Sequence, residues 1–171
     1  MEIDSEKIVK KLAHKLEKLP LPISLKNESD LEFAVLPIIK RFIQKELGIN
    51  DKKHILYHHG RNKDEKNLWS KSKPLQNIEL LGTHTYDMLI IHPKIGSLVL
   101  EFKYAASAKN PLTSRIQRII GQSLIAKLKH PYVISCLVFK RKGKRPQLGL
   151  LEKLKKDLQE NHKIYLIVRD H

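Results

Sequence analysis

The stretch that decides the fold is TYDMLIIHPKIGSLVLEFKY, residues 85–104. It holds two apolar runs, 88–91 and 98–100, separated by HPKIG at 92–96. Proline and glycine between two β-rich runs are typical of a hairpin, so the stretch predicts two antiparallel strands. Three charged residues interrupt its apolar character: Asp87 in the first half, and Glu101 and Lys103 in the second.

The alternation of strand side chains predicts which charged residues share a face. Glu101 and Lys103 are two positions apart, so they point to the same side of the strand. A loop over residues 92–96 pairs Ile91 with Ser97 and sets Asp87 directly opposite Glu101. Directly opposed side chains lie close together on one face. A slip of one residue would send Asp87 to the other face, so the register is a prediction that the structure can test.

Two adjacent carboxylates beside an ammonium group indicate a particular chemistry. The carboxylates repel each other unless a cation lies between them, and Mg²⁺ binds to one or two carboxylates with water and substrate phosphate completing its shell. A neighbouring lysine can orient or help to deprotonate a metal-bound water. This combination suits metal-assisted hydrolysis of phosphodiesters.

The spacing resembles the signature of the PD-(D/E)xK nuclease superfamily. Here Asp87 is followed, after thirteen intervening residues, by Glu101, Phe102 and Lys103. The resemblance implies a restriction-endonuclease-like fold, Asp87 and Glu101 as metal ligands, the Phe102 carbonyl as a possible third ligand, and Lys103 as the catalytic lysine. It also implies Mg²⁺ as cofactor, with Mn²⁺ as a possible substitute. The sequence departs from the signature at Tyr86, where the family name has proline.

The acidic-x-lysine pattern is common in a chain that is 30% charged, and it recurs at 51–53 and 64–66. Those copies lie in polar stretches that predict solvated loops. Only the copy at 101–103 lies in an apolar strand that follows another strand carrying an acid. The alternative to a catalytic site is a structural cluster of acids and lysine at a strand end.

Composition limits the class of protein and its partners. A chain of 171 residues predicts a single domain, here an N-terminal helical extension over 1–27 and a core over 28–171. The formal net charge of +15 predicts a polyanionic partner, either nucleic acid or an anionic membrane. No apolar run approaches the length of a membrane span, and the N-terminus lacks the apolar core of a signal peptide. The lone Cys136 predicts a buried thiol in a reducing compartment, so we expect a cytoplasmic protein.

Two helices are predicted before the hairpin. Apolar residues at helical spacing predict helices over 4–19 and 30–47. Ser29 and Glu32 fit a capping box. The nuclease resemblance instead implies a further acid on the first core helix, directed at the metal, with Glu32 as the first candidate and Glu28 as the second. Both roles for Glu32 remain open at this point.

The segment between the second helix and the hairpin is less regular. Residues 54–59 predict a strand on which His58 and His59 face opposite ways, so they cannot bind one metal together. We interpret both as structural or as neighbours of phosphate. The polar residues 60–79 predict a long loop that carries substrate contacts.

The helix predicted over 111–129 follows the hairpin. Arg115, Arg118 and Gln122 line one stripe of this helix. In the nuclease family such a helix often supplies a side chain to the site, which favours Gln122 first and Arg118 second. The alternative is an exposed polar stripe that contacts nothing.

A continuous apolar run predicts a buried strand over 132–139. The basic run that follows has five basic residues in six: Lys140, Arg141, Lys142, Lys144 and Arg145. It predicts either a phosphate contact or a solvated loop. A helix over 148–161 and a strand over 163–168 complete the order α-α-β-β-β-α-β-α-β. We therefore expect an α/β fold with a central mixed β-sheet of five strands flanked by helices, plus the extra N-terminal helix.

The leading functional hypothesis is a Mg²⁺-dependent nuclease that acts on nucleic acid, with DNA the expected substrate. The alternative is a nucleic-acid-binding module of the same fold without chemistry, although Asp87, Glu101 and Lys103 are all present. A peripheral membrane protein is a third class, but no helix pairs a basic face with exposed aromatic residues. A homodimer is consistent with the nuclease hypothesis, because one such site cuts one strand.

Overall fold

A five-stranded mixed sheet forms the centre of the protein. The computed structural model describes residues 4–48, 54–60, 62–78, 82–83, 85–105, 112–140 and 148–171. The strand order is β1-β4-β5-β6-β7. The pairs β1–β4 and β4–β5 are antiparallel, and the pairs β5–β6 and β6–β7 are parallel. The strands are β1 Ile55–Tyr57, β4 Met88–His92, β5 Gly96–Ala105, β6 Tyr132–Phe139 and β7 Ile164–Asp170. The predicted α/β class with a mixed sheet flanked by helices is confirmed.

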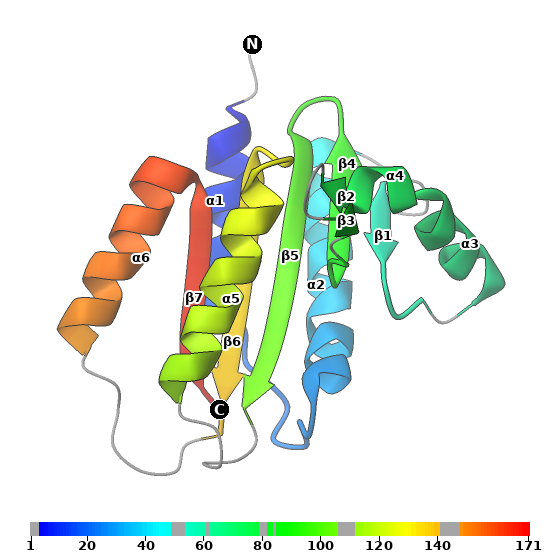
Figure 1. Ribbon diagram of the computed structural model, residues 1–171. Helices are drawn as coiled ribbons and strands as arrows, with labels where there is room; N and C mark the ends of the chain where they lie inside the picture. Colours follow the sequence, from blue (N-terminus) through cyan, green and yellow to red (C-terminus); the bar gives the residue numbers. More distant parts are fainter. Residues whose placement is uncertain are drawn as a thin grey trace.

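Helices cover both faces of this sheet (Figure 1). The helices α1 (Ser5–Glu17) and α2 (Glu28–Leu47) lie on one face, and α5 (Leu112–Lys127) and α6 (Leu148–His162) lie on the other. Helix α3 (Lys63–Lys71) lies beyond the β1 edge, whereas α4 (Lys73–Gln76) and a small hairpin of β2 (Asn77–Ile78) and β3 (Gly82–Thr83) lie in front of β1 and β4 in this view. None of the helices in these ranges is long and apolar enough to cross a membrane.

The central hairpin has the predicted register. Ile91 pairs with Ser97, and Leu89 pairs with Val99. The turn between the strands ends at Gly96, whose φ of 69° is a left-handed conformation that glycine adopts without steric cost. This register settles which face each β5 residue takes, because a strand alternates its side chains strictly.

The alternation along β5 builds two separate cores. Leu98, Leu100, Phe102 and Tyr104 belong to the apolar cluster that includes α1 and α2. Val99 belongs to the second cluster, which includes residues of α5 and α6. The extra N-terminal helix therefore contributes to the main core. The odd-numbered positions at the end of β5, Glu101 and Lys103, leave the strand on the same side as Val99, although the Lys103 ammonium reaches Glu28 on α2.

Two predictions of local structure are wrong. The long loop predicted over 60–79 contains α3 and α4 instead. Asn62 begins α3 as its N-cap, accepting a hydrogen bond from the Glu65 backbone N–H at 2.9 Å, and this cap was overlooked because α3 buries no residue that would make an apolar stripe. Helix α2 begins at Glu28 and not at residue 30, because Asn27 is its N-cap and accepts from the Asp30 N–H at 2.9 Å.

We expect the packing of α2 to be a large source of stability. Replacing the fully buried Leu31 with alanine should lower the free energy of unfolding by about 2–5 kcal/mol, because the substitution leaves a cavity. The same substitution at the exposed Leu128 should cost less than about 0.5 kcal/mol. Urea unfolding of both variants measures the difference, and equal losses would contradict the assigned core.

Candidate active site

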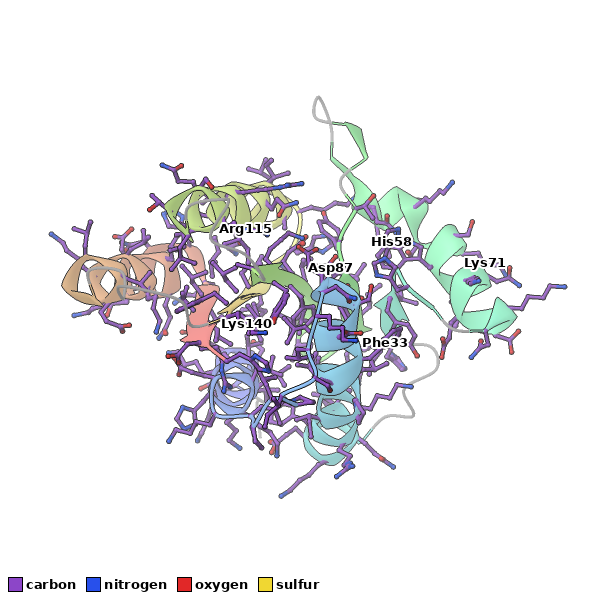
Figure 2. The ribbon with its side chains drawn as sticks, turned by 90° about the horizontal axis from the view of Figure 1, so that it is seen from below. Phe33, His58, Lys71, Asp87, Arg115 and Lys140 are labelled. Carbon is purple, nitrogen blue, oxygen red and sulfur yellow. The ribbon has the colours of Figure 1, made fainter. Side chains whose placement is uncertain are left out.

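The candidate site lies where β5 extends past β4. Strand β4 begins at Met88, opposite Leu100, so the end of β5 has no β4 backbone beside it. The side chain of Asp87 occupies that position, and its Oδ2 accepts the Phe102 N–H at 2.7 Å. A continuing antiparallel ladder would supply a backbone carbonyl there. The Asp87 carboxylate is thus held against β5 by a main-chain donor, at the end of the sheet seen in Figure 2.

Lys103 lies beside this carboxylate. Its Nζ is 3.8 Å from Asp87 Oδ2 and 3.3 Å from Glu28 Oε2 in the first turn of α2. The side chains of Lys103 and Asp87 are 12% and 13% exposed, so the pair is largely shielded from bulk water. The structure therefore brings together the predicted acid and the predicted lysine, and it adds Glu28, the second candidate for the helix acid.

Glu101 lies deeper than Asp87. It is 1% exposed, and it pairs across the parallel ladder with Ser135, whose hydroxyl oxygen is 2.6 Å from that of Ser123 on α5. Burial, with a smaller contribution from the negative charge of Glu101, raises the pKa of Tyr86 to about 12. Glu101 is thus near Tyr86 under α5, on the same side of β5 as Lys103.

Glu32 has a different partner from the one that the resemblance implies. Both of its carboxylate oxygens accept from His59, at 3.0 and 3.2 Å from Nδ1. Because Asn27 caps the helix, Glu32 lies in its second turn and does not close a capping box. Burial raises the pKa of Glu32, and the charges of Asp87 and Glu28 raise it further, while the His59 hydrogen bond lowers it. Glu32 is therefore electrostatically part of the same cluster as Asp87.

The two histidines lie in a turn, so the prediction that they face opposite ways on a strand is wrong. Strand β1 ends at Tyr57, one residue before His58. The two imidazole centroids are 4.5 Å apart, and His58 is also 5.6 Å from the ring of Trp69 on α3. Burial and the nearby His59 lower the pKa of His58, while Asp87 opposes that shift. The sequence singled out His59 as structural or as a neighbour of phosphate, but it did not predict the pairing with Glu32, which is 27 residues away.

Basic groups from two other elements reach this end of the sheet (Figure 2). Arg115 on α5 donates from Nη1 to the carbonyl of Tyr104 at 3.1 Å. Lys140 follows β6, and its backbone N–H donates to the carbonyl of Ala105 at 3.0 Å. Both residues therefore adjoin the end of β5 that carries Lys103.

The structure gives no hydrogen bond or ion pair between the other predicted site residues and Asp87, Glu101 or Lys103 among the residues that it describes. Arg118 is exposed on α5. Gln122 is half-buried there, and its side-chain oxygen has no hydrogen-bond partner among the residues that the structure describes. Four members of the basic run lie outside the described residues: Arg141, Lys142, Lys144 and Arg145.

The oxygen groups at this site fit a Mg²⁺ ion in kind. Mg²⁺ requires only one or two carboxylates when water and phosphate complete its shell, and Asp87 and Glu101 are at opposed positions of the hairpin. The Phe102 carbonyl points to the same edge as its N–H, because a strand residue directs both groups to one neighbour. Within the described ranges, no three histidine, cysteine, aspartate or glutamate side chains gather closely enough to hold a metal by themselves.

Comparison of the chain with protein-family models, with curated proteins and with solved structures gave no match.

The buried Glu32 makes a specific contribution to the pH dependence of stability. Its pKa is raised above the ordinary value of 4.5, so its protonated form favours the folded state below that value, and this contribution is lost as pH rises through the folded pKa. We expect the unfolding free energy of the parent, relative to Glu32→Gln, to fall as the pH rises above the ordinary carboxyl value of 4.5. Urea titrations below and above that pH measure it, with Glu160→Gln as the exposed control. A constant difference would contradict the burial of this charge.

Proposed function

We propose that this protein is a Mg²⁺-dependent nuclease of the PD-(D/E)xK type, with a restriction-endonuclease-like core, that hydrolyses phosphodiester bonds in DNA. One observation carries the proposal. The acid that precedes β4 is hydrogen-bonded to the backbone of the acidic-x-lysine segment of β5, with its oxygen 3.8 Å from the lysine ammonium. The acid before β4 and the lysine of β5 thus meet at the sheet end, an arrangement that suits metal-assisted hydrolysis of a phosphodiester.

Each residue has a defined task under this proposal. Asp87, Glu101 and the Phe102 carbonyl would hold the ion. Bound Mg²⁺ polarises the scissile phosphate and makes water a stronger nucleophile. Lys103 orients the attacking water and offsets negative charge, and Glu28 holds its ammonium group at 3.3 Å. Asp87 keeps its own orientation through the Phe102 N–H, so the site is arranged before substrate arrives.

The charge of the whole chain supports a nucleic-acid substrate. A net charge of +15 attracts polyanions over distance. Arg115 and Lys140 lie at the same end of the sheet as the carboxylates, and Arg118 and the rest of the basic run extend the positive surface under this proposal. These basic groups would attract phosphates to the end of β5 that carries the carboxylates.

The alternative is a nucleic-acid-binding module without chemistry. It is favoured by the absence, among the described residues, of a three-membered metal-binding group, and by the ion pair that Lys103 already makes with Glu28. Nicking of supercoiled plasmid in Mg²⁺, in Mn²⁺ and in EDTA distinguishes the two functions. Cleavage that requires the metal supports the nuclease, and binding without cleavage in any of these conditions supports the module.

Two substitutions separate metal binding from catalysis. Glu101→Gln keeps the size of the side chain but removes an anionic ligand, so Mg²⁺ binding and cleavage should both fall by at least about tenfold. Lys103→Met keeps the apolar stem and removes the charge, so metal binding should persist while cleavage falls by about 100-fold. Calorimetric Mn²⁺ titration and a nicking assay measure the two effects.

The exposed Lys156→Met variant controls for the loss of one positive charge and should cleave as the parent does. Cleavage by Lys103→Met at the parental rate would show that the lysine has no catalytic role. A parent that binds no divalent ion, even with DNA present, would favour the binding module.

Salt dependence tests the basic run. Nucleic-acid affinity should fall linearly on a log–log plot against salt, with a slope of about 0.9 per phosphate contacted. A fourfold alanine variant should flatten that slope. Its substituted residues are Lys140, Arg141, Lys142 and Lys144.

The control for this variant removes the same charge from exposed lysines of α1 and α6. Its substituted residues are Lys7, Lys15, Lys153 and Lys156. A slope that both variants reduce equally would show that the basic run acts only through net charge.

A further inference from the structure

Helix α2 carries two carboxylates that each hold a functional group from another element. Glu28 and Glu32 are four positions apart, so they lie on one face of the helix. Glu28 pairs with Lys103 from β5 at 3.3 Å, and Glu32 pairs with His59 from the turn after β1 at 3.0 Å. The Asp87 carboxylate is 3.8 Å from Lys103, and its charge acts on Glu32, so it lies near both pairs.

The two side chains of the Glu32–His59 pair differ in solvent exposure, and this difference indicates what the pair does. The Glu32 side chain is 6% exposed, whereas the His59 side chain is 45% exposed. A buried carboxylate is costly unless it is hydrogen-bonded, and here both oxygens are used on one imidazole nitrogen. The ring is thereby fixed in orientation, with Nδ1 as the donor to Glu32.

The second nitrogen of His59 is available for an outside partner. Within the described part of the chain, Nε2 makes no hydrogen bond, and the half-exposed ring adjoins a site that already presents Lys103. A pair that served packing alone would bury the ring together with the carboxylate. An imidazole with one nitrogen held by a buried acid and the other open is arranged to contact a ligand.

We propose, on the basis of the proposed nuclease function, that His59 contacts a phosphate of the bound DNA through Nε2 and that Glu32 is the positioning residue that fixes its ring. Glu32 would then not serve as a ligand of the metal. Lys103 and His59 would contact the substrate from two elements, with Asp87 between them. The substrate phosphates beside the scissile bond would thus be held from the β1 side of the sheet as well as from β5.

Two substitutions of His59 test the roles of its two ring nitrogens separately. His59→Asn places an amide N–H near the former Nδ1, so it still serves the buried Glu32, but it lacks any group at Nε2. His59→Gln reaches to the position of Nε2 and retains a donor there. We expect His59→Asn to weaken binding of a short DNA duplex in EDTA by about tenfold, and His59→Gln to lose less. His162→Asn, at an exposed helix end, is the matched control.

The decisive measurement replaces single phosphates of the duplex with neutral methylphosphonate. At the phosphate that His59 contacts, the replacement should weaken binding of the parent but should weaken binding of His59→Asn no further. A structural role for His59 would leave the two losses additive at every position, which would overturn the proposal. An affinity of His59→Asn equal to that of the parent, with metal-dependent cleavage intact in the parent, would overturn it as well.

The outcomes distinguish this inference from the function on which it rests. A parent protein that neither binds nor cleaves DNA overturns both. A parent that cleaves, with His59→Asn affected only in thermal stability, leaves the nuclease function in place and removes His59 from the substrate contacts. Circular dichroism and thermal unfolding of each variant accompany every binding curve. If His59→Asn does not fold, the test passes to the double variant Glu32→Gln, His59→Ala, which removes the buried charge together with the ring. A methylphosphonate loss in this variant equal to the parental loss at every position would overturn the contact.

Discussion

The candidate site depends on one hydrogen bond, from the Phe102 N–H to the Asp87 carboxylate. Strand β5 extends beyond the start of β4, so the Phe102 N–H has no backbone acceptor on β4. Leaving a buried donor without a hydrogen bond costs about 1–3 kcal/mol. Supplying the acceptor from a side chain meets that requirement and holds a carboxylate at a defined place. Because β4 begins only at Met88, opposite Leu100, the Asp87 side chain can lie next to Lys103 of β5.

Helix α2 is the second support of the site. Its apolar residues pack into the cluster shared with β4 and β5, so the position of its first two turns follows from the core. Those turns carry Glu28 and Glu32, which pair with Lys103 and His59. Core packing thus sets the distance between two groups that belong to separate elements, β5 and the turn after β1, and a loosened α2 would disturb both pairs together.

The sequence was sufficient for the hairpin because three independent signals agree there. The apolar runs, the Pro-Gly turn and the strict alternation of a strand all require the pairing of Ile91 with Ser97 that the structure has. Elsewhere in the sequence only one pattern was present, or the pattern indicated the wrong structure, as at the starts of α2 and α3. The structure puts Glu32 of the first core helix in the same electrostatic cluster as Asp87. Its partner could not be predicted from the sequence, because tertiary packing brings His59 to Glu32.

The errors share a physical origin. The stripe of apolar residues was used to recognise helices, and α3 has no buried residue, so it was predicted as a loop although Asn62 caps it. The start of α2 was predicted from Ser29, whereas Asn27 caps the helix first. Both caps are asparagine with its acceptor three residues before the bonded N–H. Local capping chemistry outweighed the apolar pattern at each helix start.

Electrostatics gives the strongest reason to connect this site with a cation. The chain is strongly basic, yet Glu28, Glu32 and Asp87 lie together with Lys103 and His59 as their partners. Two like unit charges 4 Å apart repel each other by about 4 kcal/mol at an effective dielectric constant of 20. A phosphate brought close to these carboxylates would be repelled by each of them to the extent that Lys103 and His59 do not neutralise it. Under the proposed function, a divalent ion held by Asp87 would offset this repulsion, and the acids at this end of the sheet would then favour metal-assisted chemistry over binding alone.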